Sequence, residues 1–512
     1  MHIERKEIIA VYEEGPNAVV RLVESLVATI SSLTEQFSAE VADLRTQVAA
    51  LKEKNERLEC ENRDLTDRVR DLEARLKMNS RNSSKPPSSD GFMKTPQQRK
   101  KTGKPPGGQK GHEGHNLKMV EDPDWIVTHS PEYCACCGRS LSRVKATGCE
   151  RRQVFDIPRI RLEVTEHRSQ IKRCPGCGQE NKAEFPSGVE APAQYGSNTK
   201  TWAAYLTGYQ HIPLKRTCEI FADMFGHPLS EATVIGANRA LSTILIPFEE
   251  QVKMELSRSP VINVDETGIR IEGRTRWLHV ASSKKLTFYG AHPNRGRKAM
   301  DEFAILPRYQ GCAVHDFWSP YLSYPCSHAL CNAHLLRELA FLEEERGEKW
   351  AGKMKKLLRK ANDAANERKA KGYKGLARSE KKKFEKRYER ILAEGFGDNP
   401  LPDIRGQPKK RGRRQKTKAR NLLERLRDYR HEVLKFMNDF QVPFDNNLAE
   451  NDIRMAKLQQ KISGCFRTWE GVRAFCRIRG YISTVRKNDI RVIDALNNAF
   501  EGEPFMPVTA EA

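Results

Sequence analysis

Three carboxylates in separate parts of the sequence are the residues best suited to chemistry. Asp265 follows the apolar run "PVINV", Asp316 follows a second run, "GCAVH", and Glu450 lies in "DNNLAENDIRMAKLQQK", which is predicted to be a helix. Acids that meet at short range repel each other unless a cation lies between them, and Mg²⁺ prefers oxygen ligands. The residue types therefore predict a phosphoryl-transfer site in which Asp265, Asp316 and Glu450 hold two Mg²⁺ ions.

Each acid taken alone also has a structural interpretation. A single Asp after a strand is usually a turn residue. Glu450 also fits a capping box with Asn447, or an ordinary helix ion pair with Arg454. Only the meeting of all three acids distinguishes the catalytic interpretation from these alternatives.

Basic residues are predicted to surround the third acid and to contact DNA. Arg454 and Lys457 follow Glu450 by four and seven residues, so they share its helix face. His334 and Arg337, in "CNAHLLREL", are expected just past a strand, where they would contact phosphate. A histidine packed in the core is the alternative for His334.

The order of predicted elements brings the first two acids together. The expected elements are a strand ending at Asp265 and broken by Gly268, strands at 276–283 and 286–292, a helix at 298–309, a strand at 311–316 and a further strand at 328–334. A three-strand meander followed by strand–helix units is the layout of a ribonuclease H-like sheet. Its first and fourth strands are neighbours, which predicts that Asp265 and Asp316 lie side by side.

Four cysteines have the spacing of a metal site. They form two C-x-x-C pairs separated by 36 residues: Cys134 with Cys137, and Cys174 with Cys177. Four thiolates on two tight turns predict one closed, structural zinc ion, and the Gly after each pair suits the turn. Residues 151–173 alternate like a strand pair, as a zinc ribbon requires. Cys136 and Cys149 do not belong to the two pairs. Because Cys136 lies next to Cys137, the identity of one zinc ligand stays open.

The first segment has the pattern of a dimerising rod. Leucine recurs every seven residues, at Leu44, Leu51, Leu58, Leu65 and Leu72. β-Branched and Asn residues occupy the other core position of the heptad, which favours two parallel helices in a homodimer or higher oligomer. The alternative is a single amphipathic helix packed on its own protein.

The remaining segments are a helical domain and a basic insert. Helices are expected across 195–245, with Ser197 and Ser230 as N-caps and Gly226 as a stop, either as a helix-turn-helix or as a plain connector. Residues 407–420 carry eight Lys or Arg in fourteen positions. This run predicts a DNA clamp made by Lys409, Lys410, Arg411, Arg413 and Arg414.

Composition agrees with a nucleic-acid partner. The chain of 512 residues has a formal net charge of +22 and 30% charged residues, and its pI is about 9.4. Such an excess favours polyanions. Neither an apolar stretch of membrane-spanning length nor a signal-peptide core is found, so a cytoplasmic protein with reduced thiols and no membrane partner is expected.

The chain resembles the transposases of the insertion sequence 66 family. The resemblance rests on the leucine zipper, "NSSKPPSSD", the paired C-x-x-C, "DETG", "HDFWSPY", "CNAHLLREL" and "DNNLAENDIRMAKLQQKISGCFRT". It implies a DDE-type enzyme of the bacterial nucleoid with Asp265, Asp316 and Glu450 as its triad, a helical insert between the second and third acids, and small companion proteins from the same element.

The predicted fold is therefore a multidomain α+β protein. Its expected segments are a coiled-coil rod at 20–78, a flexible basic linker at 79–118, a zinc ribbon at 119–190, a helical DNA-binding domain at 191–250, the first part of a ribonuclease H-like α/β core at 255–334, a basic helical insert at 335–440, and the completion of the core at 441–500. The expected function is cleavage of element ends and joining of the freed 3′-OH to target DNA. The rivals are a zinc-containing DNA-binding regulator without catalysis and a nuclease that cuts without joining.

Overall fold

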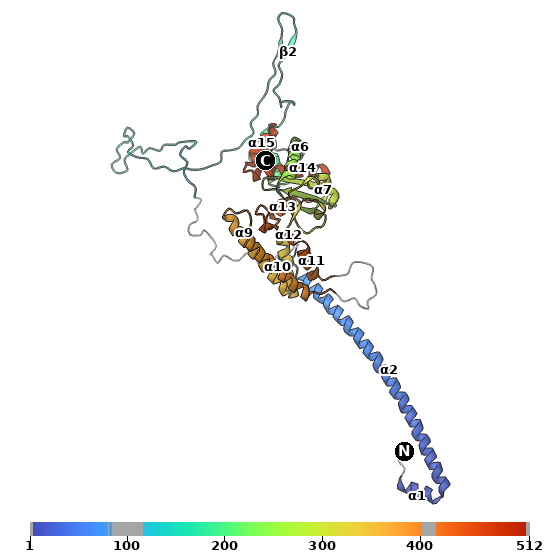
Figure 1. The fold of residues 1–512 in the computed structure, drawn as a ribbon. Helices are drawn as coiled ribbons and strands as arrows, with labels where there is room; N and C mark the ends of the chain where they lie inside the picture. The colour runs from blue at the N-terminus through green and yellow to red at the C-terminus, as the bar shows by residue number, and fades with distance from the viewer. Residues whose placement is uncertain (1–3, 80, 84–115, 402–415, 508–512) are drawn as a thin grey trace. The chain divides into compact units, whose positions relative to one another are not determined.

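The structure is a computed structural model that describes residues 4–79, 81–83, 116–401 and 416–507 (Figure 1). Most of the predicted linker and the basic residues Lys409, Lys410, Arg411, Arg413 and Arg414 lie outside the described residues. The chain divides into two units, residues 1–93 with 344–347 and the rest, and each is described by itself. No helix in the described part combines the length and the apolar character needed to cross a bilayer.

The first unit is dominated by one long helix. α1 (Arg5–Glu13) is followed at Gly15, whose φ is 105°, by α2 (Pro16–Leu76), which runs for 61 residues (Figure 1). The heptad leucines lie on its surface: Leu51 is 65% exposed and Leu58 is 42% exposed. The segment is thus one continuous helix with an exposed apolar seam, and the pairing of two such helices stays a prediction.

The segment with the paired cysteines contains little regular structure. β1 (Ile171–Arg173) pairs antiparallel with β2 (Glu180–Lys182). The prediction of a strand pair at 151–173 is wrong for residues 151–170. These residues are all described and form no strand. Val154 and Val164 are 92% and 94% exposed, so these side chains have no apolar surface to pack against.

Helices follow where the sequence predicts them. Their bounds are α3 (Ser197–Ala204), a π-helical turn (Tyr205–Tyr209), α4 (Leu214–Phe225), α5 (Glu231–Ile244) and α6 (Ile246–Arg258). Gly226 ends α4 in the left-handed conformation at φ 67°, and Ser230 Oγ accepts a hydrogen bond from Thr233 N at 3.0 Å at the start of α5. Both caps are confirmed. Ser197 is not a cap, because the helix begins on it after Gly196.

A five-stranded mixed sheet forms the centre of the second unit. Its strands are β3 (Val261–Ile271), β4 (Arg274–Ser282), β5 (Thr287–His292), β6 (Cys312–His315) and β7 (Ser327–Leu330). Their order is β5-β4-β3-β6-β7, with β3, β4 and β5 antiparallel and with β6 and β7 parallel to β3. The prediction that the first and fourth strands are neighbours is confirmed.

Strand β3 is longer than predicted. It continues through Asp265 and Gly268 to Ile271, so Asp265 lies within the strand rather than at its end. The reason is that Gly268 still pairs with Trp277 of β4, and that Ile269 and Ile271 are buried. The chain turns only after Ile271, at residues 272–273, where both residues have positive φ.

Both faces of the sheet are covered. Ile262 and Val264 pack in a core with residues of α6, whereas Ile269 and Ile271 pack in a second core with Ala449 and other residues of α13 (Asn447–Ser463). Alternate residues of a strand point to opposite faces. Odd-numbered residues of β3, including Asp265, therefore face α13, and even-numbered ones face the opposite side.

Helices surround the sheet and connect its last strand to α13. After β5 come α7 (Arg297–Phe303) and a 3₁₀ turn (Leu306–Arg308), and Tyr321–Ser323 forms a second such turn between β6 and β7. After β7 come α8 (Asn332–Arg346), α9 (Lys349–Ala370), α10 (Arg378–Asp398), α11 (Lys418–Asp428) and α12 (Arg430–Val433). The chain ends with α14 (Trp469–Lys487) and α15 (Val492–Phe500). More than a hundred residues therefore separate β7 from the helix that covers β3.

Candidate functional site

The first two acids are aligned by the pairing of β3 with β6. Val261 pairs with Cys312, and Asn263 pairs with Val314. The same register carries Asp265 to Asp316, which follows β6 directly. Because these two strands are parallel, the carboxylates leave them in the same direction. Asp316 Oδ1 accepts a hydrogen bond from Trp318 N at 2.9 Å, which fixes the turn after β6.

The third acid is brought to β3 by a buried asparagine. Asn446 precedes α13 and donates through Nδ2 to the carbonyl oxygen of Val264 at 2.9 Å. Its Oδ1 accepts from Asn263 Nδ2 at 2.8 Å. Both contacts lie immediately before Asp265, so the first turn of α13, with Glu450, is held over that part of the strand. The capping box considered for Glu450 is not formed, since Asp445 Oδ1 accepts from Asn447 N instead.

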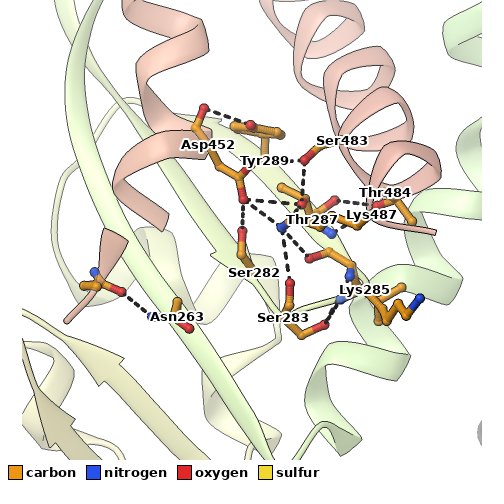
Figure 2. Close-up of polar contacts among 12 residues, drawn as sticks. Asn263, Ser282, Ser283, Lys285, Thr287, Tyr289, Asp452, Ser483, Thr484 and Lys487 are labelled. Atoms are coloured by element: carbon orange, nitrogen blue, oxygen red, sulfur yellow. Dashed lines mark hydrogen bonds and ion pairs between the residues drawn. The ribbon is translucent and has the colours of Figure 1, made fainter. Parts of the chain in front are cut away.

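A polar network holds the next part of α13 against the sheet (Figure 2). Asp452 Oδ2 accepts from Ser282 Oγ at 2.6 Å and from Lys487 Nζ at 2.9 Å, and Asp452 Oδ1 accepts from Ser483 Oγ at 3.1 Å. Asp452 and Lys487 side chains are each only 14% exposed. β4, α13 and α14 thereby meet at one carboxylate two residues from Glu450. This network was not predicted from the sequence.

The three acids interact electrostatically, although their oxygens form no cluster within 4.8 Å in the described part of the chain. Burial, followed by the negative charges of Glu266, Asp316 and Glu450, raises the pKa of Asp265 well above its usual range. Glu450 Oε1 is buried and has no hydrogen-bond partner among the described residues. Crowded carboxylates with an unsatisfied oxygen suit a hard divalent cation. The donor set therefore fits Mg²⁺.

Two of the predicted DNA-binding residues lie beside Glu450. His334 Nδ1 is 3.8 Å from Glu450 Oε1, and Arg337 Nη2 is 3.9 Å from Glu450 Oε2. Arg454 is exposed, and its Nη1 donates to Asn451 Oδ1 at 3.2 Å instead of pairing with Glu450. Lys457 donates to the carbonyl oxygen of Gly268, which ties α13 to β3.

The neighbouring acid, Glu266, lies on the opposite face of β3 and is hydrogen-bonded to other side chains there. Its carboxylate accepts from Arg295 Nη2 at 2.7 Å and from the hydroxyl of Tyr321. The Arg295 guanidinium in turn lies 4.8 Å from the ring centre of Trp277 and 4.2 Å from that of Trp318. Sequence reasoning missed this arrangement; the alternation of residues along the strand is the signal that places Glu266 away from Asp265.

The paired cysteines form two similar turns. Gly138 N donates to Cys134 O, and Gly178 N donates to Cys174 O, each at 2.9 Å. Both glycines have positive φ, as the tight turn requires. In each turn, backbone hydrogen bonds from the second half of the turn lower the pKa of the first thiol. The two turns thus present their cysteines in the same local conformation.

The structure does not gather all four thiols into one group. Among the described residues, the only three or more potential ligand atoms within 4.8 Å of one another belong to Cys331, His334 and Glu450. Sites of four cysteines are ordinarily completed by the ion itself, because the ligands must lose their protons to bind it. The structure therefore shows two cysteine turns, each folded by its own backbone hydrogen bonds.

Comparison with known proteins agrees with these features. Residues 192–474, which contain the three acids, match the family described as transposase IS66 family. Residues 131–178, which contain both cysteine pairs, match the zinc-finger binding domain of transposase IS66, and this match supports zinc as a ligand of the segment. Residues 26–118 match a family of unknown function. No curated protein matches the chain. Since the first match covers more than half of the sequence, the chain belongs to the transposase IS66 family.

Proposed function

We propose that this transposase cleaves the ends of an insertion element and joins the freed 3′-OH to target DNA by two-metal phosphoryl transfer. The observation that carries the proposal is that three elements with one acid each adjoin: β3 with Asp265, the end of β6 with Asp316, and the first turn of α13 with Glu450. The charges of Asp316 and Glu450 both raise the pKa of Asp265, as expected if the acids form one site.

The sheet supports the proposal that the core is ribonuclease H-like. Three antiparallel strands are followed by two strands parallel to the first, and the order β5-β4-β3-β6-β7 is the one expected for such a sheet. The first acid then lies on the central strand, the second directly after its parallel neighbour and the third on a helix that packs on β3 and β4.

The acids of this site would hold the Mg²⁺ ions. When bound, a pair of such ions activates water and stabilises the leaving oxygen of a phosphodiester. Asp265, on the central strand of the sheet, would help to hold both ions, and Asp316 and Glu450 would each hold one. Hydrolysis exchanges a P–O bond of the DNA for a bond to water and leaves a 3′-OH. In the joining step, that hydroxyl displaces another 3′-oxygen in target DNA.

Basic residues near the acids would orient the DNA. Arg337 and His334 lie close to Glu450 without a short hydrogen bond to it, so both remain able to contact a phosphate that enters the site. Exposed Arg454 would extend this contact, whereas Lys457 at its present position mainly supports α13. Phosphate contacts of this kind position DNA without reading its sequence.

The outlying segments would bind and pair DNA ends. We propose that Cys134, Cys137, Cys174 and Cys177 bind one structural zinc ion. α4 and α5 would act as the helical DNA-binding element, and the basic residues at 409–414 would form a clamp. The exposed apolar seam of α2 would close in a parallel homodimer, so that two ends are held together. Companion proteins from the same element would complete the assembly.

The test is cleavage and joining of labelled element ends in Mg²⁺, with candidate companion proteins added or withheld. The variants Asp265→Asn, Asp316→Asn and Glu450→Gln should each bind ends as the parent does and abolish cleavage. Asp494→Asn, which changes an acid on α15, serves as the matched control. Full cleavage by Asp265→Asn would refute the assignment of the three acids as the catalytic triad, whereas end binding without any cleavage by the parent would indicate a DNA-binding regulator. Cleavage without joined product, using pre-nicked ends, would indicate a nuclease.

A further inference from the structure

A second group of metal-binding side chains adjoins the third acid. Cys331 lies between β7 and α8, His334 lies in the first turn of α8, and Glu450 lies on α13. One potential ligand atom from each lies within 4.8 Å of the other two. The group thus comes from two segments that the insert separates by more than a hundred residues.

Two of these atoms lack the contacts that buried polar atoms normally have. His334 Nδ1 and Glu450 Oε1 are buried and have no hydrogen-bond partner within the described residues. They are 3.8 Å apart, which is too long for a hydrogen bond between them. Leaving both unsatisfied is unfavourable, so an ion or a water molecule between them would stabilise the arrangement.

The chemistry of the donors favours a metal of intermediate softness. Sulfur, imidazole nitrogen and carboxylate oxygen together are typical zinc ligands, whereas Mg²⁺ does not select sulfur. Cys331 is fully buried and its Sγ accepts a hydrogen bond from Asn446 N at 3.2 Å, an outer contact that orients the sulfur. The side chains of His334 and Glu450 stay 24% and 14% exposed. A fourth ligand would therefore come from solvent.

We propose that Cys331, His334 and Glu450 bind one Zn²⁺ ion at a site separate from the cysteine turns. Binding forms a Zn–S bond while the thiol proton passes to solvent. The bound ion would take Glu450 from the Mg²⁺ ions, so that zinc inhibits cleavage. This second consequence rests on the proposed function, whereas the binding itself does not.

The amount of zinc that each protein retains tests whether the site binds zinc. The full chain is saturated with Zn²⁺, dialysed, and its zinc is measured by mass spectrometry. Cys331→Ser and His334→Ala should each hold one zinc ion fewer per chain than the parent. Cys312→Ser, which alters another buried thiol, on β6, should hold the parental amount. Equal zinc in the parent and both site variants would overturn the proposal and leave a bridging water between His334 and Glu450. If Cys331→Ser does not fold, His334→Ala decides alone.

Cleavage in Mg²⁺ with increasing Zn²⁺ tests the consequence. The parent should be inhibited, and His334→Ala should need more zinc for the same inhibition. The expected shift exceeds the roughly 10–100-fold that loss of an outer-shell partner causes in metal affinity. Equal inhibition of the two proteins would refute the sharing of Glu450. If neither cleaves DNA under any condition, the proposed function fails, and the zinc content still decides whether the site exists.

Discussion

Replacing Asp265 by Asn should stabilise the metal-free protein and remove most of its stabilisation by Mg²⁺. In the metal-free protein, Asp265 is a half-buried carboxylate whose pKa is raised by desolvation and by three neighbouring acids. The folded state therefore binds its proton more tightly than the unfolded state does. The stability that this provides is complete below the unfolded pKa, near 4, and is lost as the pH rises through the folded pKa. At a pH above both values the charge destabilises the fold.

The magnitude follows from the pKa shift and from mass action. Each unit by which the folded pKa exceeds the unfolded one costs about 1.4 kcal/mol of stability above both values. Asp265→Asn removes that cost, so its Tm in a chelator at neutral pH should exceed that of the parent, by about 2–4 °C for each kcal/mol of cost removed. Mg²⁺ at ten times its dissociation constant should stabilise the parent by about 1.4 kcal/mol and the variant hardly at all.

The assay is thermal unfolding followed by circular dichroism, in a chelator and in Mg²⁺, at several pH values. In the chelator the stability of the parent should decline as the pH rises from 4, and that of Asp265→Asn should decline less. Asp494→Asn, which removes an exposed acid of α15, is the control and should respond to Mg²⁺ as the parent does. An equal response of the parent and Asp265→Asn to Mg²⁺ would show that Asp265 holds no ion.

Four further variants test the residues that hold α13 on the sheet, the long helix α2 and the cysteine turns. Asn446→Ala should cost about 2 kcal/mol in chemical unfolding, because two buried partners on β3 lose their hydrogen bonds; an unchanged midpoint would refute that anchor. Asp452→Ala should cost about 3–5 kcal/mol by leaving a buried ammonium unpaired, and a loss below about 1 kcal/mol would contradict the network. Leu51→Asp combined with Leu58→Asp should give a monomer in sedimentation, and a persisting dimer would assign α2 another role. Cys174→Ser should remove one zinc ion per chain; parental zinc content would exclude Cys174 as a ligand.

The arrangement of the sheet was predictable because its signals are local. The apolar runs of β3 and β6 each precede an acid, and the spacing of Asp265 and Asp316 matches the register of two parallel neighbours. The cap at Ser230 and the stop at Gly226 are likewise properties of a few adjacent residues. Such features depend on backbone geometry and on short-range hydrogen bonds, which neighbouring residue types determine.

The supports of the site were not predictable because they depend on distant segments. Asn446 and Asp452 lie in a polar stretch that resembles any exposed helix start, and only the position of α13 on the sheet gives them partners on β3, β4 and α14. The error at residues 151–170 has the opposite cause. Alternation predicted strands there, but alternation produces a strand only where another surface covers one side.

The position of Glu450 beyond the helical insert has a consequence during protein synthesis. The ribosome adds 133 residues between Asp316 and Glu450, which at about 5–20 residues per second takes roughly 7–27 s. Throughout that interval the growing chain already carries its cysteine turns and two of its acids, but it lacks α13. If Glu450 completes the proposed site, a nascent polypeptide would therefore be unable to cleave DNA until α13 has been synthesised.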